Sequence, residues 1–391
     1  MTLIYESGLA RTGDAASDVV LWEERATQGG MALGIATLNA AKTINALSLD
    51  MIRSLDAGLR RWAGDPRVAC VILTGAGEKG FCAGGDVRQV RESVLAYHGP
   101  APNPQAQAFF SEEYRLDYYL HTYPKPLLVW GDGVVMGGGL GLMAGASHRV
   151  VTERSRIAMP EVSIGFYPDV GASWFLRRMP ARLGLFLGLT GAVLNARDAL
   201  ATGLADHALH AADREPLLER LTHLAWGTTA AENRVALSRA LRSFAGPAVD
   251  HLPSSNVLSH ADAIQRLTQG DTLAEIHGQM ADYHGTDPWL QRAVRTALGG
   301  SPTSASLIWE IRRRAKHLSL AGALRMELIV SLQCCGHPDF AEGVRALLVD
   351  KDNSPHWTPA TLDEVSAPWI AGHFVAPWPA GPDGFHPLRD L

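Results

Sequence analysis

Cysteine is scarce in this chain, with only four residues among 391: Cys70, Cys82, Cys334 and Cys335. Two of them are adjacent and none forms a CxxC pair, so we expect neither a disulfide framework nor a cysteine zinc site. The 15 histidines form no HExxH pattern and no other close spacing typical of metal ligands. The sequence therefore predicts no metal centre.

Long apolar runs and an excess of positive charge are also missing. The net charge of -5 gives no reason to expect nucleic acid or an anionic membrane as a partner. No uninterrupted run of about 18 apolar residues is present that would span a membrane. The first 17 residues lack the basic and apolar regions of a secretory signal, and hold two acids and one arginine. We expect a soluble protein with a cytoplasmic location.

The richest stretch of the sequence begins with the apolar run 127–130, which is typical of a buried strand. Met136 and the glycines Gly137, Gly138 and Gly139 follow, and they open an apolar segment that reads as a helix. Consecutive glycines cost backbone entropy, so they indicate a place where a ligand approaches the main chain closely. At a helix start, free N–H groups favour an oxygen with negative charge.

A second glycine-rich turn follows the apolar strand 68–74, where Ala83, Gly84 and Gly85 precede Asp86. The simpler explanation is two tight strand-to-helix turns, with Asp86 capping the helix that begins at Val87. Two such turns in consecutive strand–helix units are uncommon, and each could contribute one N–H group. Two donors aimed at one oxygen would form an oxyanion hole, which favours enolate or acyl-transfer chemistry.

Two carboxylates, Glu161 and Asp169, lie in apolar settings downstream of the glycine turns. Without other signals, such acids usually cap helices or pair with arginines. Because these two follow a predicted oxyanion hole, a catalytic role is favoured. Glu113 lies on a predicted aromatic helix, 109–123, where most acids face solvent. Lys42 is a surface cation by its context, unless a phosphate-bearing ligand binds there.

A competing signal is the pattern G-x-G-x-x-A formed by Gly139, Gly141 and Ala144, which resembles a dinucleotide-binding fingerprint. That fingerprint requires an acid at the end of the next strand, about 20 residues on. Glu153 comes too early, and Glu161 does not follow a strand. An NAD-dependent enzyme is therefore the weaker alternative.

Three segments together resemble the crotonase (enoyl-CoA hydratase/isomerase) superfamily: PKPLLVWGDGVVMGGGLGL, FCAGGDVR and MPEVSIGFYPDVG. They are most similar to its 3-hydroxyisobutyryl-CoA hydrolase branch, as is the segment FFSEEY at 109–114. The resemblance covers roughly residues 19–374 and implies an α/β fold, a spiral of ββα units with a helical C-terminal region. Residues 18–214 would form the spiral core with the site, and residues 215–391 would complete the same unit.

The resemblance also implies an acyl-CoA substrate and a set of site residues. The oxyanion hole would use the N–H groups of Gly85 and Gly138, and Glu161 and Asp169 would be the catalytic carboxyls. Glu113 would contact the polar end of the acyl group. Further substrate contacts would come from Lys42, Ala83, Gly84, Asp86 and Gly137.

No cofactor is implied beyond the CoA of the substrate itself. The branch implies hydrolysis of a short branched 3-hydroxyacyl-CoA and a place in valine catabolism. Because superfamily members often form trimers or hexamers, a homo-oligomer is compatible with the resemblance.

Some positions depart from the wider family pattern. Enoyl-CoA hydratases carry the first of two glutamates where this chain has Gly141, so a hydratase would lack half of its acid–base pair. This favours the hydrolase over a hydratase, whereas a double-bond isomerase working with one base is the stronger alternative. A catalytically silent acyl-CoA-binding protein is disfavoured because both Glu161 and Asp169 are present. Ala172 and Ser173 stand in a run that is usually all glycine, and we expect their bulk to reshape the acyl pocket.

Overall fold

The computed structural model describes residues 18–378 and 385–391. The N-terminal segment on which the expected cytoplasmic location rests lies outside these residues. A search of the described residues for helices finds none that is both long and apolar enough to cross a membrane.

The chain begins with a hairpin and a helix, as the sequence predicts. β1 (Val20–Ala26) and β2 (Ala32–Leu38) pair in antiparallel register. α1 (Leu49–Gly64) follows, and the side chain of Ser48 accepts a hydrogen bond from the Met51 N–H at 3.2 Å, which caps its first turn. Its buried stripe follows the 3.6-residue helical period and packs into the main core at Met51, Ile52, Leu55, Leu59 and Trp62.

Three strand pairs then form the spiral of ββα units. The first strand of each pair joins a six-stranded sheet of order β1-β2-β3-β5-β7-β9, and the second joins a three-stranded sheet of order β4-β6-β8. The pairs are β3 (Val68–Gly75) with β4 (Gly80–Cys82), β5 (Leu127–Gly131) with β6 (Val134–Met136), and β7 (His148–Thr152) with β8 (Arg156–Ala158), and β9 (His207–Leu209) ends the larger sheet. This α/β architecture confirms the predicted fold.

Short helices follow the strand pairs and lead out of the glycine turns. The first is α2 (Val87–Ala96), which Asp86 caps by accepting a hydrogen bond from the Gln89 N–H at 3.2 Å. The second is α4 (Gly138–Ala144), which begins at the triple glycine. The two turns therefore end neighbouring strands of the three-stranded sheet, β4 and β6.

One long helix differs from its expected bounds. The sequence predicts a loop over residues 96–107, but α3 (Pro104–His121) begins within it. Asn103 caps α3 by accepting from the N–H groups of Gln105 and Ala106, and proline is favoured at the first helical position because its missing N–H needs no partner there. α3 packs against α1 and α15.

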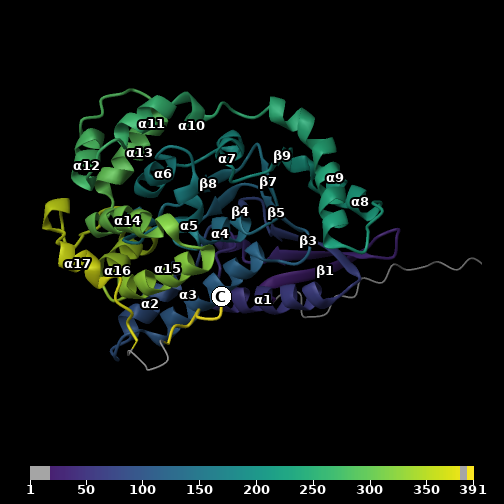
Figure 1. Cartoon of the computed structure of the whole chain (residues 1–391), viewed down its shortest axis with the longest axis horizontal. Helices are drawn as coiled ribbons and strands as arrows, with labels where there is room; N and C mark the ends of the chain where they lie inside the picture. The colour runs from purple at the N-terminus through teal and green to yellow at the C-terminus, as the bar shows by residue number, and fades with distance from the viewer. Residues whose placement is uncertain (1–17, 379–384) are drawn as a thin grey trace, which may run out of the picture.

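The remaining helices surround the sheets, and Figure 1 shows α8 to α17 as an arc around the strands. Their bounds are α5 (Ala172–Phe175), α6 (Leu183–Thr190), α7 (Ala196–Thr202), α8 (Arg214–Thr222), α9 (Ala230–Asp250), α10 (Asn256–Ser259), α11 (Ala261–Leu267), α12 (Leu273–Ala281), α13 (Pro288–Gly299), α14 (Pro302–Arg314), α15 (Leu320–Cys335), α16 (Pro338–Val344) and α17 (Ala367–Gly372). One large core cluster includes residues from both sides of position 215.

Two long stretches with an apolar pattern are divided into separate helices. Residues 304–334 lie in α14 and α15, and Ser319 caps the second by accepting from the Gly322 N–H at 3.1 Å. Residues 174–189 lie in α5, a 3-10 turn η3 (Leu176–Arg178) and α6, with Pro180 in the gap. In both cases the apolar pattern continues across the break, so periodicity alone does not reveal it.

Candidate active site

A cavity of about 510 Å³ lies between the two glycine turns, α3 and the segment after β8. All ten residues singled out from the sequence line it: Lys42, Ala83, Gly84, Gly85, Asp86, Glu113, Gly137, Gly138, Glu161 and Asp169. The C-terminal region contributes Leu347 and Leu348 from a π-helical turn, η6 (Arg345–Val349). The fold therefore brings residues from six separate segments to one cavity.

The two glycine turns present backbone N–H groups to this cavity. Leu47 pairs with Gly85 in a parallel bridge that uses the Gly84 carbonyl and the Asp86 N–H, each at 2.8 Å, so the Gly85 N–H points away from Leu47. Gly138 is the first residue of α4, where an N–H has no partner within the helix. A methyl group added at Gly138 would lie 3.4 Å from the Gly85 nitrogen, so the two donors are neighbours.

The turns require glycine at the positions before each donor. Gly84 has a φ of 108° and Gly137 a φ of 50°, a region that residues with side chains rarely adopt. A Cβ at Gly137 would also lie 3.0 Å from Glu161 Oε1. The glycines thus serve both backbone conformation and close approach of the acid.

Glu161 begins the 3-10 turn η2 (Glu161–Ile164) and is 6% exposed. Its Oε2 atom is buried and has no hydrogen-bond partner among the described residues. Burial raises the pKa of Glu161 well above its usual range, and the nearby Asp169 raises it further. Such a carboxyl binds a proton strongly, which suits a group that takes a proton from water.

Asp169 is also 6% exposed, but its carboxyl is held in place. Its Oδ2 accepts a hydrogen bond of 2.6 Å from the Tyr114 hydroxyl. Burial raises the pKa of Asp169 to about 7, although the Tyr114 hydrogen bond opposes this shift. Asp169 therefore changes charge near neutral pH.

Glu113 lies on the face of α3 that is directed at the glycine turns, and is 2% exposed. Its Oε1 atom would be 2.5 Å from a Cβ added at Gly138 and 3.8 Å from one at Gly85. That oxygen has no hydrogen-bond partner in the described part of the chain. Burial raises the pKa of Glu113, and the negative charge of Asp169 raises it further. The position of Glu113 thus differs from the solvent-facing one that its sequence context favours.

Comparison with known proteins shows which family combines these features. The family model described as enoyl-CoA hydratase/isomerase matches residues 33–374. The chain belongs to the enoyl-CoA hydratase/isomerase family. Within that family, it is 36% identical over 374 residues to 3-hydroxyisobutyryl-CoA hydrolase, mitochondrial, of Homo sapiens, covering 95% of this chain and 92% of that protein. The hydrolase of the same name from Danio rerio is 38% identical over 340 residues, covering 86% and 85%.

Solved structures of the enoyl-CoA hydratase/isomerase family share the fold but carry other names. A carnitinyl-CoA dehydratase from Mycobacterium thermoresistibile matches with a TM-score of 0.80 at 36% identity, covering 94% of this chain and 98% of that one. An enoyl-CoA hydratase from Rhodobacter sphaeroides 2.4.1 matches with a TM-score of 0.76 at 33% identity, covering 91% and 97%. The local geometry must therefore decide between reaction types.

Gly141 stands where the resemblance to the enoyl-CoA hydratase/isomerase family places the first glutamate of a hydratase. A Cβ at Gly141 would lie 2.7 Å from the Val170 Cβ and 3.1 Å from Asp117 Oδ1. A glutamate could not enter without displacing Val170, which itself has an unusual φ of 52°. Packing therefore leaves no room at Gly141 for that first hydratase glutamate.

The dinucleotide fingerprint has a different explanation in the enoyl-CoA hydratase/isomerase fold. A Cβ at Gly139 would lie 2.5 Å from the Cys82 carbonyl oxygen, and Gly141 is closed off by Val170. Both glycines allow α4 to pack closely against neighbouring segments, and among the described residues neither lines the cavity. The glycine pattern therefore has a packing explanation that requires no dinucleotide.

Sequence reasoning missed two buried acids close to the cavity. Asp117 lies one helical turn after Glu113 and is 1% exposed, and neither of its oxygens has a partner among the described residues. Glu327 on α15 is fully buried, and it accepts from the N–H groups of Gly171 at 2.7 Å and Ser173 at 3.0 Å. Two sequence signals could have found these acids. Asp117 follows Glu113 at the i, i+4 spacing that puts both on one helix face, and Glu327 is an acid within the apolar segment of α15.

Ala172 and Ser173 do not contact the cavity directly, so their expected effect on the acyl pocket stays a prediction. Neither residue is among those that line the cavity within the described part of the chain. Both instead line a second pocket behind the segment 167–173. The reason is that the chain reverses direction at Val170 and Gly171, which both have positive φ.

Proposed function

We propose that this chain hydrolyses 3-hydroxyisobutyryl-CoA, or a closely similar short branched 3-hydroxyacyl-CoA, to the free acid and CoA. The observation that carries the proposal is the meeting of Glu161 and Asp169 with two backbone donors in a cavity that has no side chain at Gly141. The names of the relatives from Homo sapiens and Danio rerio support the same activity.

The N–H groups of Gly85 and Gly138 bind the thioester oxygen. As water adds to the carbonyl carbon, that oxygen gains negative charge and both hydrogen bonds strengthen. This stabilises the transition state more than the bound substrate, which is the condition for catalysis. Each such donor contributes roughly 3–4 kcal/mol.

Glu161 takes the proton of the attacking water and later delivers it to the sulfur of the departing CoA. The new C–O bond forms, the C–S bond breaks, and thioester plus water become acid plus thiol. Direct attack by Glu161, with a mixed anhydride that water then hydrolyses, gives the same balance. Both routes need Glu161 ionised before the bond forms.

Asp169 and Glu113 contact the polar end of the acyl group. The Tyr114 hydroxyl fixes the Asp169 carboxyl, so that it orients water or the 3-hydroxyl of the substrate. Glu113 lies beside the two backbone donors and contacts the same end of the acyl group.

The CoA part of the substrate lies toward Lys42 and Arg88, two exposed cations on the lining of the cavity. Asn45 holds the segment that carries Lys42 against β4, because its Nδ2 donates to the carbonyls of Gly80 at 3.2 Å and Phe81 at 3.1 Å. No cofactor is proposed beyond the CoA of the substrate. The cytoplasmic location, the role in valine catabolism and a homo-oligomer stay predictions.

The substrate assignment is tested by measuring thiol release from two thioesters. With 3-hydroxyisobutyryl-CoA we expect saturable release, and with isobutyryl-CoA, which lacks the hydroxyl, we expect kcat/KM to fall at least about tenfold because Asp169 and Glu113 lose their partner. Equal kcat/KM for both thioesters would contradict the assigned roles of these acids. Binding of both thioesters without thiol release would identify a silent acyl-CoA-binding protein.

A further inference from the structure

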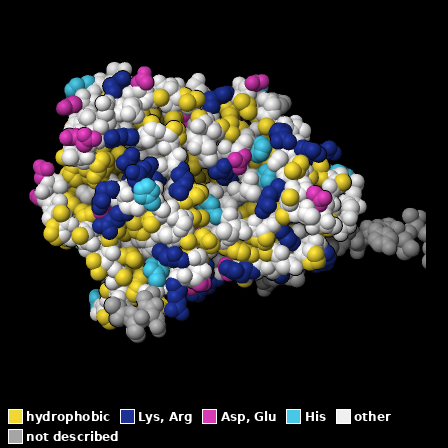
Figure 2. Space-filling view, in the orientation of Figure 1, with side chains coloured by type: hydrophobic (Ala, Val, Ile, Leu, Met, Phe, Trp, Pro, Cys, Tyr) yellow, Lys and Arg dark blue, Asp and Glu magenta, His cyan; other side chains and the backbone are white. Residues whose placement is uncertain are grey.

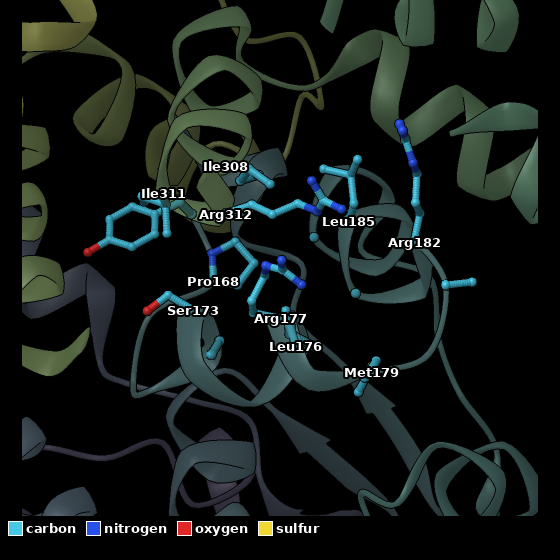
Figure 3. Close-up of a pocket in the computed structure, with 15 residues that line it drawn as sticks. Pro168, Ser173, Leu176, Arg177, Met179, Arg182, Leu185, Ile308, Ile311 and Arg312 are labelled. Carbon is cyan, nitrogen blue, oxygen red and sulfur yellow. The ribbon is translucent and has the colours of Figure 1, made fainter. Parts of the chain in front are cut away.

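A second pocket lies on the opposite side of the segment 167–173 from the catalytic cavity. Tyr167 and Pro168 line this pocket, while the next residue, Asp169, lines the catalytic cavity. Figure 3 shows the second pocket with α14 above it and the turn that carries Arg177 below it. The two cavities therefore share one wall.

Three arginines from three separate segments face this pocket: Arg177 on η3, Arg182 just before α6, and Arg312 on α14. Figure 3 shows the guanidinium groups of Arg177 and Arg312 near each other at the pocket, whereas the Arg182 side chain extends away from them. In the space-filling view, Lys and Arg side chains gather over α5, α6 and α14 (Figure 2). We call Arg177, Arg182 and Arg312 the arginine cluster.

The arginine cluster has little to compensate its charge. Within the described ranges 18–378 and 385–391, none of the three forms an ion pair with a carboxylate. Arg182 donates to the carbonyls of Thr268 at 2.6 Å and Gly270 at 2.5 Å. The Nε atom of Arg177 is buried and has no partner among the described residues.

Like charges held together in this way destabilise the fold unless a ligand compensates them. Burial lowers the pKa of Arg312, and the positive charges of Arg177 and Arg182 lower it further. The guanidinium group nevertheless remains protonated at any ordinary pH, so the cluster cannot lose its charge by titration. The three arginines are only partly buried, and a bound anion would compensate their charge more directly than water does.

The size and walls of the pocket restrict the kind of anion. Its volume of about 40 Å³ limits the ligand to a few heavy atoms. Apolar side chains line the rest of it: Leu176, Met179, Leu185, Ile308 and Ile311. A carboxylate on a chain of one or two further carbons matches both the arginines and the apolar lining. Inorganic phosphate would instead place oxygens against the apolar wall.

We propose that the arginine cluster binds the carboxylate of a short aliphatic acid, at a site separate from the catalytic cavity. The planar guanidinium groups of Arg177 and Arg312 match the fork geometry of a carboxylate. This site does not depend on the proposed thioester hydrolysis.

Isothermal titration of the purified protein with sodium propionate tests the proposal, with inorganic phosphate as the comparison probe. We expect saturable propionate binding that weakens at least tenfold in the double variant Arg177→Gln/Arg312→Gln. Arg313→Gln is the matched control, because Arg313 is on the same helix but exposed and paired with Glu310 at 2.7 Å. Arg312→Lys keeps the charge without the fork, so binding should be intermediate.

Two results would overturn the proposal. One is propionate binding of equal strength in the double variant, provided that thermal unfolding shows the variant to be folded. The other is phosphate binding that is tighter than propionate binding in the wild-type protein. Absence of any saturable propionate binding to the wild type would likewise overturn it.

Discussion

The segment 167–173 separates two pockets of opposite character. On one side, Glu113, Glu161 and Asp169 line the catalytic cavity, and the charges that influence their pKa values come only from other acids. On the other side lies the arginine cluster, and no Asp or Glu among the described residues lines its pocket. Each pocket thus gathers like charges in a partly or fully buried place, which costs stability.

The two sides differ in how they can relieve that cost. Buried carboxyls can bind protons, and burial raises the pKa of all three acids as a result. Arginine cannot lose its proton under ordinary conditions. The acidic side is therefore suited to moving protons, and the basic side to holding an anion.

The shared wall is fixed from behind by hydrogen bonds. The Ser331 hydroxyl lies 2.6 Å from the Tyr114 hydroxyl and 2.8 Å from that of Tyr167, so one serine on α15 links both faces of the wall. Glu327 on the same helix accepts from the Gly171 N–H at 2.7 Å. The C-terminal region therefore positions the segment that carries Asp169.

The largest change is expected from Glu161→Gln, which removes the proton acceptor on the acidic side. The amide keeps the size of the side chain, so we expect kcat for thiol release to fall about 10²–10⁴-fold with CoA affinity retained. Steady-state kinetics and calorimetry measure the two quantities. Glu112→Gln is the control, because Glu112 forms an exposed pair with Arg53. A kcat within threefold of the wild type would rule out Glu161 as the base.

Gly138→Ala should be the next most damaging change to the acidic side. The new methyl group would lie 2.5 Å from Glu113 Oε1, so it displaces either this carboxyl or the donor itself. Loss of one oxyanion donor lowers kcat about 10²–10³-fold. Gly278→Ala provides the control, because a Cβ there meets nothing within 4 Å. Unchanged kcat in Gly138→Ala would mean that this N–H does not serve the thioester oxygen.

The raised pKa values predict that stability and activity change in opposite directions with pH. Unfolded aspartate titrates near pH 4, whereas burial raises the pKa of folded Asp169 to about 7. The folded state then holds more protons between these values, so the free energy of unfolding falls as pH rises from 5 to 8. Thiol release should increase as pH rises, because Glu161 must ionise and its pKa is raised by burial.

Urea unfolding at pH 5 and pH 8 measures this dependence. In Asp169→Asn, the free energy of unfolding should fall less between pH 5 and pH 8 than it does in the wild type. Asp65→Asn should leave it unchanged, because hydrogen bonds from Arg67 lower the pKa of Asp65 to about 2, outside this window. A rise in stability from pH 5 to pH 8 in the wild type would contradict the neutral, buried state of these acids.

The smallest effect is expected on the basic side. In buffer without carboxylates, Arg312→Gln relieves repulsion from Arg177 and Arg182, and we expect the free energy of unfolding to rise by about 0.5 kcal/mol or less. Chemical denaturation measures the change against Arg313→Gln. A clear loss of stability in Arg312→Gln would show that the guanidinium is already compensated.

The sequence predicts the parts of the site whose chemistry is local. Strand–glycine–helix turns and the buried strand β5 follow from short patterns, and the structure brings the chosen residues to one cavity. Asp117, Glu327 and the arginine cluster were not found, because their meaning comes from contacts between distant segments. Helix breaks at Pro180 and Ser319 also lie within continuous apolar patterns.

The central claim is that a cavity without a side chain at Gly141 cleaves the thioester rather than hydrating a double bond. One assay tests it, with 3-hydroxyisobutyryl-CoA and crotonyl-CoA supplied in turn to the wild-type protein. The account predicts thiol release from the first and no loss of the enoyl absorbance from the second. Rapid hydration of crotonyl-CoA without thiol release from 3-hydroxyisobutyryl-CoA would contradict it, and would show that Glu161 serves carbon–carbon double-bond chemistry instead.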